Sequence, residues 1–129
     1  MRLIELTPEV HDQAVAAASH LPHAAASLLV ELAGDQQALD VASTGFRDAT
    51  RIASGDPGVW MDIFQTNRDA VVAQLERFEQ RVAAFRRGLA DGDDARIRHI
   101  LEQAKQRRDA WRAERDRLDA AAPEEADES

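Results

Sequence analysis

The chain has 129 residues, a length that suits one domain, and its 44% hydrophobic and 31% charged residues are typical of a soluble globular protein. The absence of cysteine excludes disulfides, thiolate nucleophiles and cysteine-bound metals, and a net charge of −8 argues against general nucleic-acid binding. No run approaches the roughly 18 apolar residues of a membrane span, and the N-terminal residues do not resemble a signal peptide. We therefore expect a cytoplasmic protein with no membrane or nucleic-acid partner.

The first helix is predicted to begin where Thr7 and Pro8 form an N-cap followed by proline at the first helical position. It should run to about His20 and then kink or break at Pro22, because proline donates no backbone hydrogen bond and clashes with the preceding turn. The helix should resume after this proline and end near Gly34. Its second half carries a leucine stripe that should be buried: Leu21, Leu28, Leu29 and Leu32.

The middle of the chain is predicted to be less regular. Residues 35–43 favour a short helix capped by Asp35, whereas residues 44–57 form the least regular part of the body. Asp56 followed by Pro57 is a helix-start signal, so another helix should follow and extend to about Asn67.

Beyond Asn67, apolar residues recur at alternating spacings of four and three, in two stretches separated by a turn at residues 91–94. Together these stretches predict a helical hairpin. The predicted fold class is therefore all-α, a helical bundle with two long antiparallel C-terminal helices. The seam residues are Val71, Leu75, Phe78, Val82, Phe85 and Leu89 in the first helix, and Ile97, Leu101, Ala104, Trp111 and Leu118 in the second.

The seams also predict how the chain assembles. Their large aromatic residues need more cover than one hairpin supplies, which favours a symmetric homodimer. Residues 1–120 should form the helical domain, and residues 121–129 an acidic disordered tail.

Histidines cluster unusually in residues 11–23. A metal site here is disfavoured, because only Asp12 could complete a set of ligands with His20 and His23. Two interpretations remain open and carry equal weight. An imidazole could be a hydrogen-bonded, half-buried packing residue, or Ser19, His20 and His23 could line a polar pocket at Pro22 and donate to an anionic or carbonyl oxygen.

Arg51 is the second candidate binding residue, in a segment flanked by glycines. It could form a surface ion pair with Asp48, three residues earlier, which would contribute little. Alternatively it could be a guanidinium fork for a carboxylate, supported by Asp48. Trp60 is expected to pack in the core or at an interface. No phosphate-binding glycine motif and no self-contained catalytic set is visible.

Taken together, these two clusters resemble the C-terminal helical domain of prephenate dehydrogenases. The resemblance is carried by the string SHLPH at residues 19–23 and by GFRDATRIASGDPGVW at residues 45–60, with His11, Asp12, Asp62, Ile63 and Asn67 alongside. It covers about residues 9–90.

The resemblance implies a function and a set of roles. That family converts prephenate, with NAD or NADP, to 4-hydroxyphenylpyruvate and carbon dioxide, and its helical domain dimerises. Arg51 would then bind a prephenate carboxylate with support from Asp48. His23 would be a pocket histidine, linked in some members to inhibition by tyrosine, and Trp60 would lie near the pocket and the subunit interface. The family's catalytic histidine and cofactor glycines belong to an N-terminal dinucleotide-binding domain that is absent from this chain. We therefore expect no catalytic residue, no bound cofactor and no activity in this chain alone.

Two alternatives belong to other functional classes. One is a small helical enzyme resembling chorismate mutase, for which Arg108 and Arg115 in the last seam could supply the cations. The other is a non-enzymatic helical module that senses a ligand or binds a partner.

Overall fold

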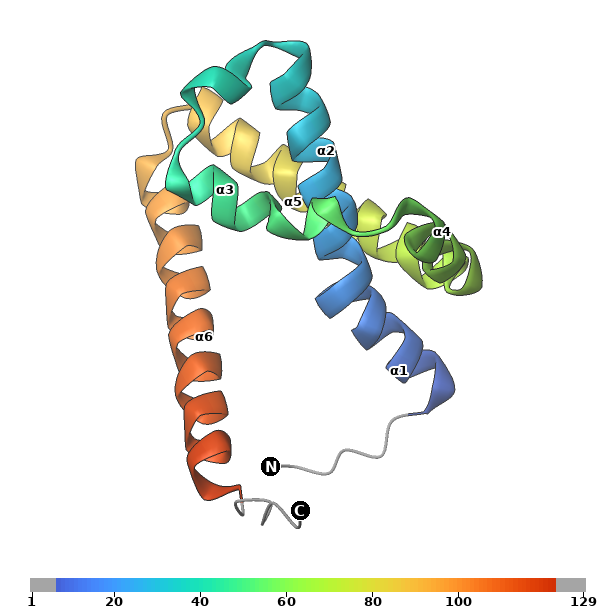
Figure 1. Cartoon of the computed structure of the whole chain (residues 1–129). Helices are drawn as coiled ribbons and strands as arrows, with labels where there is room; N and C mark the ends of the chain where they lie inside the picture. The colour runs from blue at the N-terminus through green and yellow to red at the C-terminus, as the bar shows by residue number, and fades with distance from the viewer. Residues whose placement is uncertain (1–6, 123–129) are drawn as a thin grey trace. The chain divides into compact units, whose positions relative to one another are not determined.

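The computed structural model describes residues 7–122, and all regular structure within that range is helical (Figure 1). This confirms the predicted all-α class. The described chain falls into two compact units, residues 7–80 and residues 81–122. The elements in chain order are α1 (Pro8–Val15), a π-helical turn (Ala16–His20), α2 (Leu21–Asp35), a 3-10 turn (Ala38–Val41), α3 (Thr44–Thr50), a second 3-10 turn (Arg51–Ser54), α4 (Pro57–Thr66), α5 (Arg68–Ala90) and α6 (Asp94–Ala121).

The chain stays helical through Pro22, so the predicted alternative of a break at this proline is wrong. The Leu21 N–H donates to the Ala16 carbonyl, five residues back, so the hydrogen-bond register shifts by one residue before α2 begins. Pro22 then lies in the first turn of α2, where a missing N–H leaves no helical hydrogen bond unmade. A π-helical turn of this kind is frequent at functional sites.

The middle of the chain differs from the prediction in two places. Residues 35–43 contain only a 3-10 turn, because α2 continues through Asp35 and Gln37 then takes a left-handed conformation with φ of 56°. Residues 44–54 are helical where an irregular segment was predicted. The Ser43 hydroxyl caps α3 by accepting from the Phe46 N–H at 3.5 Å, a start signal that the prediction missed. The predicted start of α4 is confirmed, since the Asp56 carboxylate accepts from the Gly58 N–H at 2.8 Å.

The two long C-terminal helices are confirmed, with 23 residues in α5 and 28 in α6. α5 ends at Ala90, and the turn after it contains Gly92, which has a φ of +69°. In this turn the Asp93 N–H donates to the Gly88 carbonyl at 2.9 Å. Several seam residues are exposed in the described chain, among them Phe78 at 43% and Trp111 at 56%, whereas Val71 at the start of the first seam is buried. Residues from 123 onward, which include most of the predicted tail, lie outside the described part of the chain.

The buried core of the first unit is small and forms where α1 and the π-helical turn meet the start of α5. Ala16, Ala70 and Val71 are buried there, with Phe64 and Leu75 packed against them. The Gln74 amide donates to the Gln13 side-chain oxygen at 2.7 Å and links α5 to α1.

The predicted burial of the leucine stripe on α2 is wrong for three of its four members. Leu28, Leu29 and Leu32 are exposed, at 55%, 46% and 58%. Among the helices of residues 7–122, none combines the length and apolarity that a bilayer crossing requires.

Candidate functional site

A stack of aromatic rings joins α2 to α4. His23 lies against Trp60 with ring centroids 3.7 Å apart and ring planes within 10° of parallel. Phe64, one turn along α4, lies 5.7 Å from Trp60, and His20 approaches Trp60 edge-on at 6.3 Å. Such stacked and edge-on pairs stabilise packing beyond the area they bury. The rings thus bring together three residues singled out from the sequence: His20, His23 and Trp60.

Gly55 makes this stack possible. A Cβ atom on Gly55 would lie 2.7 Å from Nε1 of Trp60 and 3.2 Å from Cε1 of His23. These separations are shorter than van der Waals contact, so any larger residue would displace the rings. The segment between the second 3-10 turn and α4 therefore packs its backbone directly against both rings.

His23 is a buried imidazole, with 5% of its surface exposed. Burial lowers the pKa of His23 below its usual value of 6.5, so the ring is neutral at pH 7. Its Nδ1 atom is buried and has no hydrogen-bond partner in the described chain. His23 therefore packs through its ring faces, but it is more deeply buried than a half-buried packing residue and its Nδ1 atom makes no hydrogen bond in the described chain.

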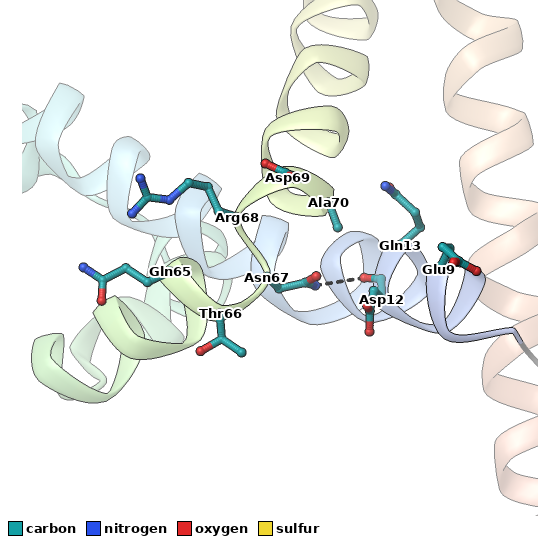
Figure 2. Close-up of a pocket in the computed structure, with 9 residues that line it drawn as sticks. All are labelled: Glu9, Asp12, Gln13, Gln65, Thr66, Asn67, Arg68, Asp69 and Ala70. Atoms are coloured by element: carbon teal, nitrogen blue, oxygen red, sulfur yellow. Dashed lines mark hydrogen bonds between the residues drawn. The ribbon is translucent and has the colours of Figure 1, made fainter.

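His20 faces a different neighbour, Asn67 at the end of α4. The Asn67 side-chain nitrogen lies 3.3 Å from Nδ1 of His20 and donates to the Asp12 carbonyl at 2.9 Å (Figure 2). Asn67 and Asp12 line two adjoining pockets, the one drawn in Figure 2, of about 350 Å³, and a second of about 420 Å³ that also includes His20. The second pocket is lined by His11, Asp12, Val15, His20, Asp62, Ile63, Thr66 and Asn67.

Arg51 lines a third pocket, of about 490 Å³, together with Arg47 one helical turn earlier. Thr50 forms part of its wall and is held by a hydrogen bond from its hydroxyl to the Phe46 carbonyl at 2.7 Å. No ion pair joins Arg51 to Asp48 in the described residues, so the surface-pair interpretation does not hold there. The pocket therefore offers two guanidinium groups, on residues four apart, to an anionic ligand.

The predicted residues thus divide into three groups. His20 and His23 each pair with Trp60, Arg51 lines a separate pocket, and Ser19 and Asp48 are exposed.

Three further residues were missed by sequence reasoning. Arg47 could have been found from its spacing of four from Arg51 on a helix. Asn67 was named only among the residues that carry the family resemblance, without a role of its own, and Gly55 acts through a contact that no sequence spacing encodes.

Arg108 and Arg115, which the mutase alternative requires, lie on an exposed stretch of α6. Arg108 stacks over the ring of Trp111, with 4.6 Å from its guanidinium carbon to the ring centroid. Within residues 7–122, no three histidine, aspartate or glutamate side chains gather as they would around a metal ion. The chemistry offered is therefore recognition by guanidinium, imidazole and aromatic groups.

Comparison with known proteins gives a consistent result. Residues 7–103 match the family described as prephenate dehydrogenase, dimerization domain. The chain is 32% identical over 111 residues to a prephenate dehydrogenase of Bacillus subtilis, and 31% identical over 113 residues to a cyclohexadienyl dehydrogenase of Zymomonas mobilis. Each match covers 82% of this chain but only 30% and 39% of the respective relative, so the chain spans about a third of their length.

Two solved structures share the fold. Arogenate dehydrogenase from Synechocystis superposes with a TM-score of 0.75 at 29% identity, over 82% of this chain and 41% of that one. Prephenate dehydrogenase from A. aeolicus, solved with hydroxyphenyl propionate and NAD+, superposes with a TM-score of 0.73 at 32% identity, over 80% of this chain and 38% of that one.

Proposed function

Because this chain belongs to the prephenate dehydrogenase family, whose dimerization domain it matches over residues 7–103, we propose that it supplies the dimer interface and part of the substrate pocket of such an enzyme. The reaction is the oxidative decarboxylation of prephenate to 4-hydroxyphenylpyruvate, in the cytoplasm, with NAD or NADP. Residues 1–120 constitute the helical domain. The cofactor is held by a dinucleotide-binding domain other than residues 7–103, and the helical domain alone binds none. The family match carries the proposal.

Arg51 is the residue proposed to bind a substrate carboxylate. Prephenate carries two carboxylates, and a guanidinium can engage one of them through two parallel hydrogen bonds. Arg47 lines the same pocket, and neither arginine has an acidic partner among the described residues. Asp48, one turn before Arg51 on the same helical face, can orient the guanidinium once the ligand orders it.

The imidazoles and Trp60 are proposed to complete the substrate side of the site. Trp60 stacks on the buried His23 ring and is itself only partly buried, and a six-membered substrate ring is proposed to lie against it. His20 and Ser19 add polar atoms from the π-helical turn. Tyrosine, which shares the substrate's ring and carboxylate chemistry, is proposed as an inhibitor of the same site.

The exposed seams support the proposed homodimer. Large apolar residues of α5 and α6 lie on the surface of the described chain, among them Phe78, Leu101 and Trp111. A second copy related by two-fold symmetry would cover them with the same surface. An interface of this obligate kind buries more than roughly 2,000 Å² in total.

Titration of the chain with hydroxyphenyl propionate, followed by NMR, tests the substrate side of the proposal. Saturable shifts are expected at Arg51, His20 and Trp60. Arg51→Ala should weaken binding by about fivefold, since an exposed ion pair contributes up to roughly 1 kcal/mol. Arg77→Ala, which removes an exposed arginine on α5, is the matched control and should bind like the wild type. Unchanged spectra throughout the titration, or equal affinity for Arg51→Ala, would contradict the assignment.

A further inference from the structure

The Asp12 carbonyl lies in the last turn of α1, beside the π-helical turn. The Ala16 N–H is shared between the carbonyls of Asp12 and Gln13. A bond shared between the carbonyls four and three residues back is common at helix ends. The Asp12 carbonyl also accepts from the Asn67 side chain at 2.9 Å, a contact drawn in Figure 2. The Asn67 side chain therefore ties α1 to the junction between α4 and α5.

This contact determines which way the Asn67 amide faces. A backbone carbonyl can only accept a hydrogen bond, so the atom 2.9 Å from it is the amide nitrogen Nδ2 and not the oxygen. The same Nδ2 lies 3.3 Å from Nδ1 of His20. An amide NH₂ donates two hydrogen bonds and accepts none, so its second hydrogen points to a lone pair on Nδ1.

The proton of the neutral His20 ring must then be on the other nitrogen. A neutral imidazole with a lone pair on Nδ1 carries its proton on Nε2. Nε2 makes no hydrogen bond within residues 7–122 and is not among their buried unpaired atoms. His20 therefore keeps an N–H donor available while its other nitrogen is held by the protein.

We propose that Asn67 is a positioning residue that holds His20 as the Nε2-protonated tautomer, so that His20 donates to an uncharged oxygen, carbonyl or hydroxyl, of the bound ligand. The pocket that includes His20 also contains the carboxylates of Asp12 and Asp62 and the imidazole of His11. These two carboxylates disfavour a further anion beside His20, so an uncharged ligand oxygen is the better acceptor. The ligand part of this inference rests on the proposed function, whereas the tautomer does not.

The tautomer is measured directly by two-bond hydrogen–nitrogen correlation spectra of the ¹⁵N-histidine-labelled chain, at a pH about two units above the usual imidazole pKa of roughly 6.5. The wild type should show the Nε2–H form for His20. A spectrum of the Nδ1–H form, or of an averaged mixture, would overturn the inference without any variant.

Variants then assign the effect to Asn67. Asn67→Asp replaces the donor by a carboxylate that only accepts, so the tautomer should change to Nδ1–H. Gln65→Ala, an exposed neighbour on α4 with no bond to His20, is the matched control and should leave the tautomer unchanged. A His20 spectrum in Asn67→Asp identical to that of the wild type would refute the role of Asn67.

Binding of hydroxyphenyl propionate distinguishes the positioning of His20 by Asn67 from the proposed contact between His20 and the ligand. Asn67→Asp should bind it about three- to tenfold more weakly than the wild type, the scale of one lost hydrogen bond. Equal affinity would overturn the ligand contact. If the wild type shows the Nε2–H tautomer but binds no hydroxyphenyl propionate, the positioning role of Asn67 stands and the proposed function fails.

Discussion

Replacing Gly55 with alanine should destabilise the protein even though the backbone there is ordinary. Gly55 has φ of −62° and ψ of 159°, an extended conformation that any residue adopts. The cost therefore comes only from the added methyl group, which would lie 2.7 Å from Nε1 and 3.0 Å from Cδ1 of Trp60. Both atoms belong to a rigid ring that is stacked on His23, so the ring cannot yield without opening the stack.

The magnitude follows from two opposing effects. Forcing an extra methyl group into a packed site costs about 1–3 kcal/mol. Alanine also restricts the unfolded chain more than glycine does, which stabilises the folded state by about 0.4–1 kcal/mol. The expected net effect is a loss of about 1–2 kcal/mol in the free energy of unfolding.

Gly45→Ala provides a control of opposite sign. Gly45 lies inside α3, and a Cβ there would meet only the Ser43 hydroxyl at 3.7 Å, an ordinary contact. Alanine inside a helix is favoured over glycine by roughly 0.5–1 kcal/mol, so this variant should be more stable than the wild type. Urea unfolding followed by circular dichroism measures both variants. A Gly55→Ala protein as stable as Gly45→Ala would refute the close-contact argument.

The remaining predictions concern assembly, cofactor, substrate and pH. Sedimentation of the chain should show a homodimer, and a monomer at micromolar concentration would contradict the proposed interface. The purified chain should neither bind NAD(P) nor reduce it with prephenate, and detectable turnover would overturn the proposed division of roles. In a complete dehydrogenase, Arg51→Ala should raise KM by an amount equivalent to about 2–5 kcal/mol without lowering Tm. Arg51→Lys should restore only part of the lost substrate binding. Near-normal kinetics of Arg51→Ala would remove the assignment of Arg51 as a carboxylate-binding residue. An NMR titration of His23 should give a midpoint below 6.5. Because the unfolded state then binds more protons, the free energy of unfolding should fall as pH drops through about 6.5, and a midpoint above this value would exclude that contribution.

Local signals in the sequence were sufficient to predict a structural feature where the residue contacts only residues close to it in the chain. Thr7 caps α1 and Asp56 caps α4 as predicted, because a capping side chain bonds to an N–H two or three residues along the chain. The regular spacing of apolar residues likewise predicted the two long helices. Proline at position 22 was less informative, since a π-helical turn and a break satisfy its missing N–H equally well.

The site depended on contacts that local patterns do not contain. The SHLPH string indicated His20 and His23 as candidates, but their partners come from α4 and its end, far along the sequence. Trp60 stacks on His23, and Asn67 bonds to His20 only because the π-helical turn and α4 lie side by side. The need for glycine at position 55 follows from the same packing. The sequence thus indicated which side chains matter and left open what each one contacts.

Arg51→Ala is expected to have a small effect on ligand binding in the isolated chain and a larger effect on KM in a complete dehydrogenase, and the exposure of Arg51 explains this difference. Arg51 is exposed in the described chain, and a carboxylate bound there remains in contact with water, where an ion pair contributes at most roughly 1 kcal/mol. A loss of about 2–5 kcal/mol requires a pocket from which water has been excluded, since the attraction between charges grows as the local dielectric falls. Comparing Arg51→Ala in the isolated chain with the same change in a complete dehydrogenase therefore measures how far other surfaces enclose this pocket. A large effect only in the complete enzyme would place the closing surface outside this chain, and equal effects in both would mean that the pocket shown here is already the whole carboxylate site.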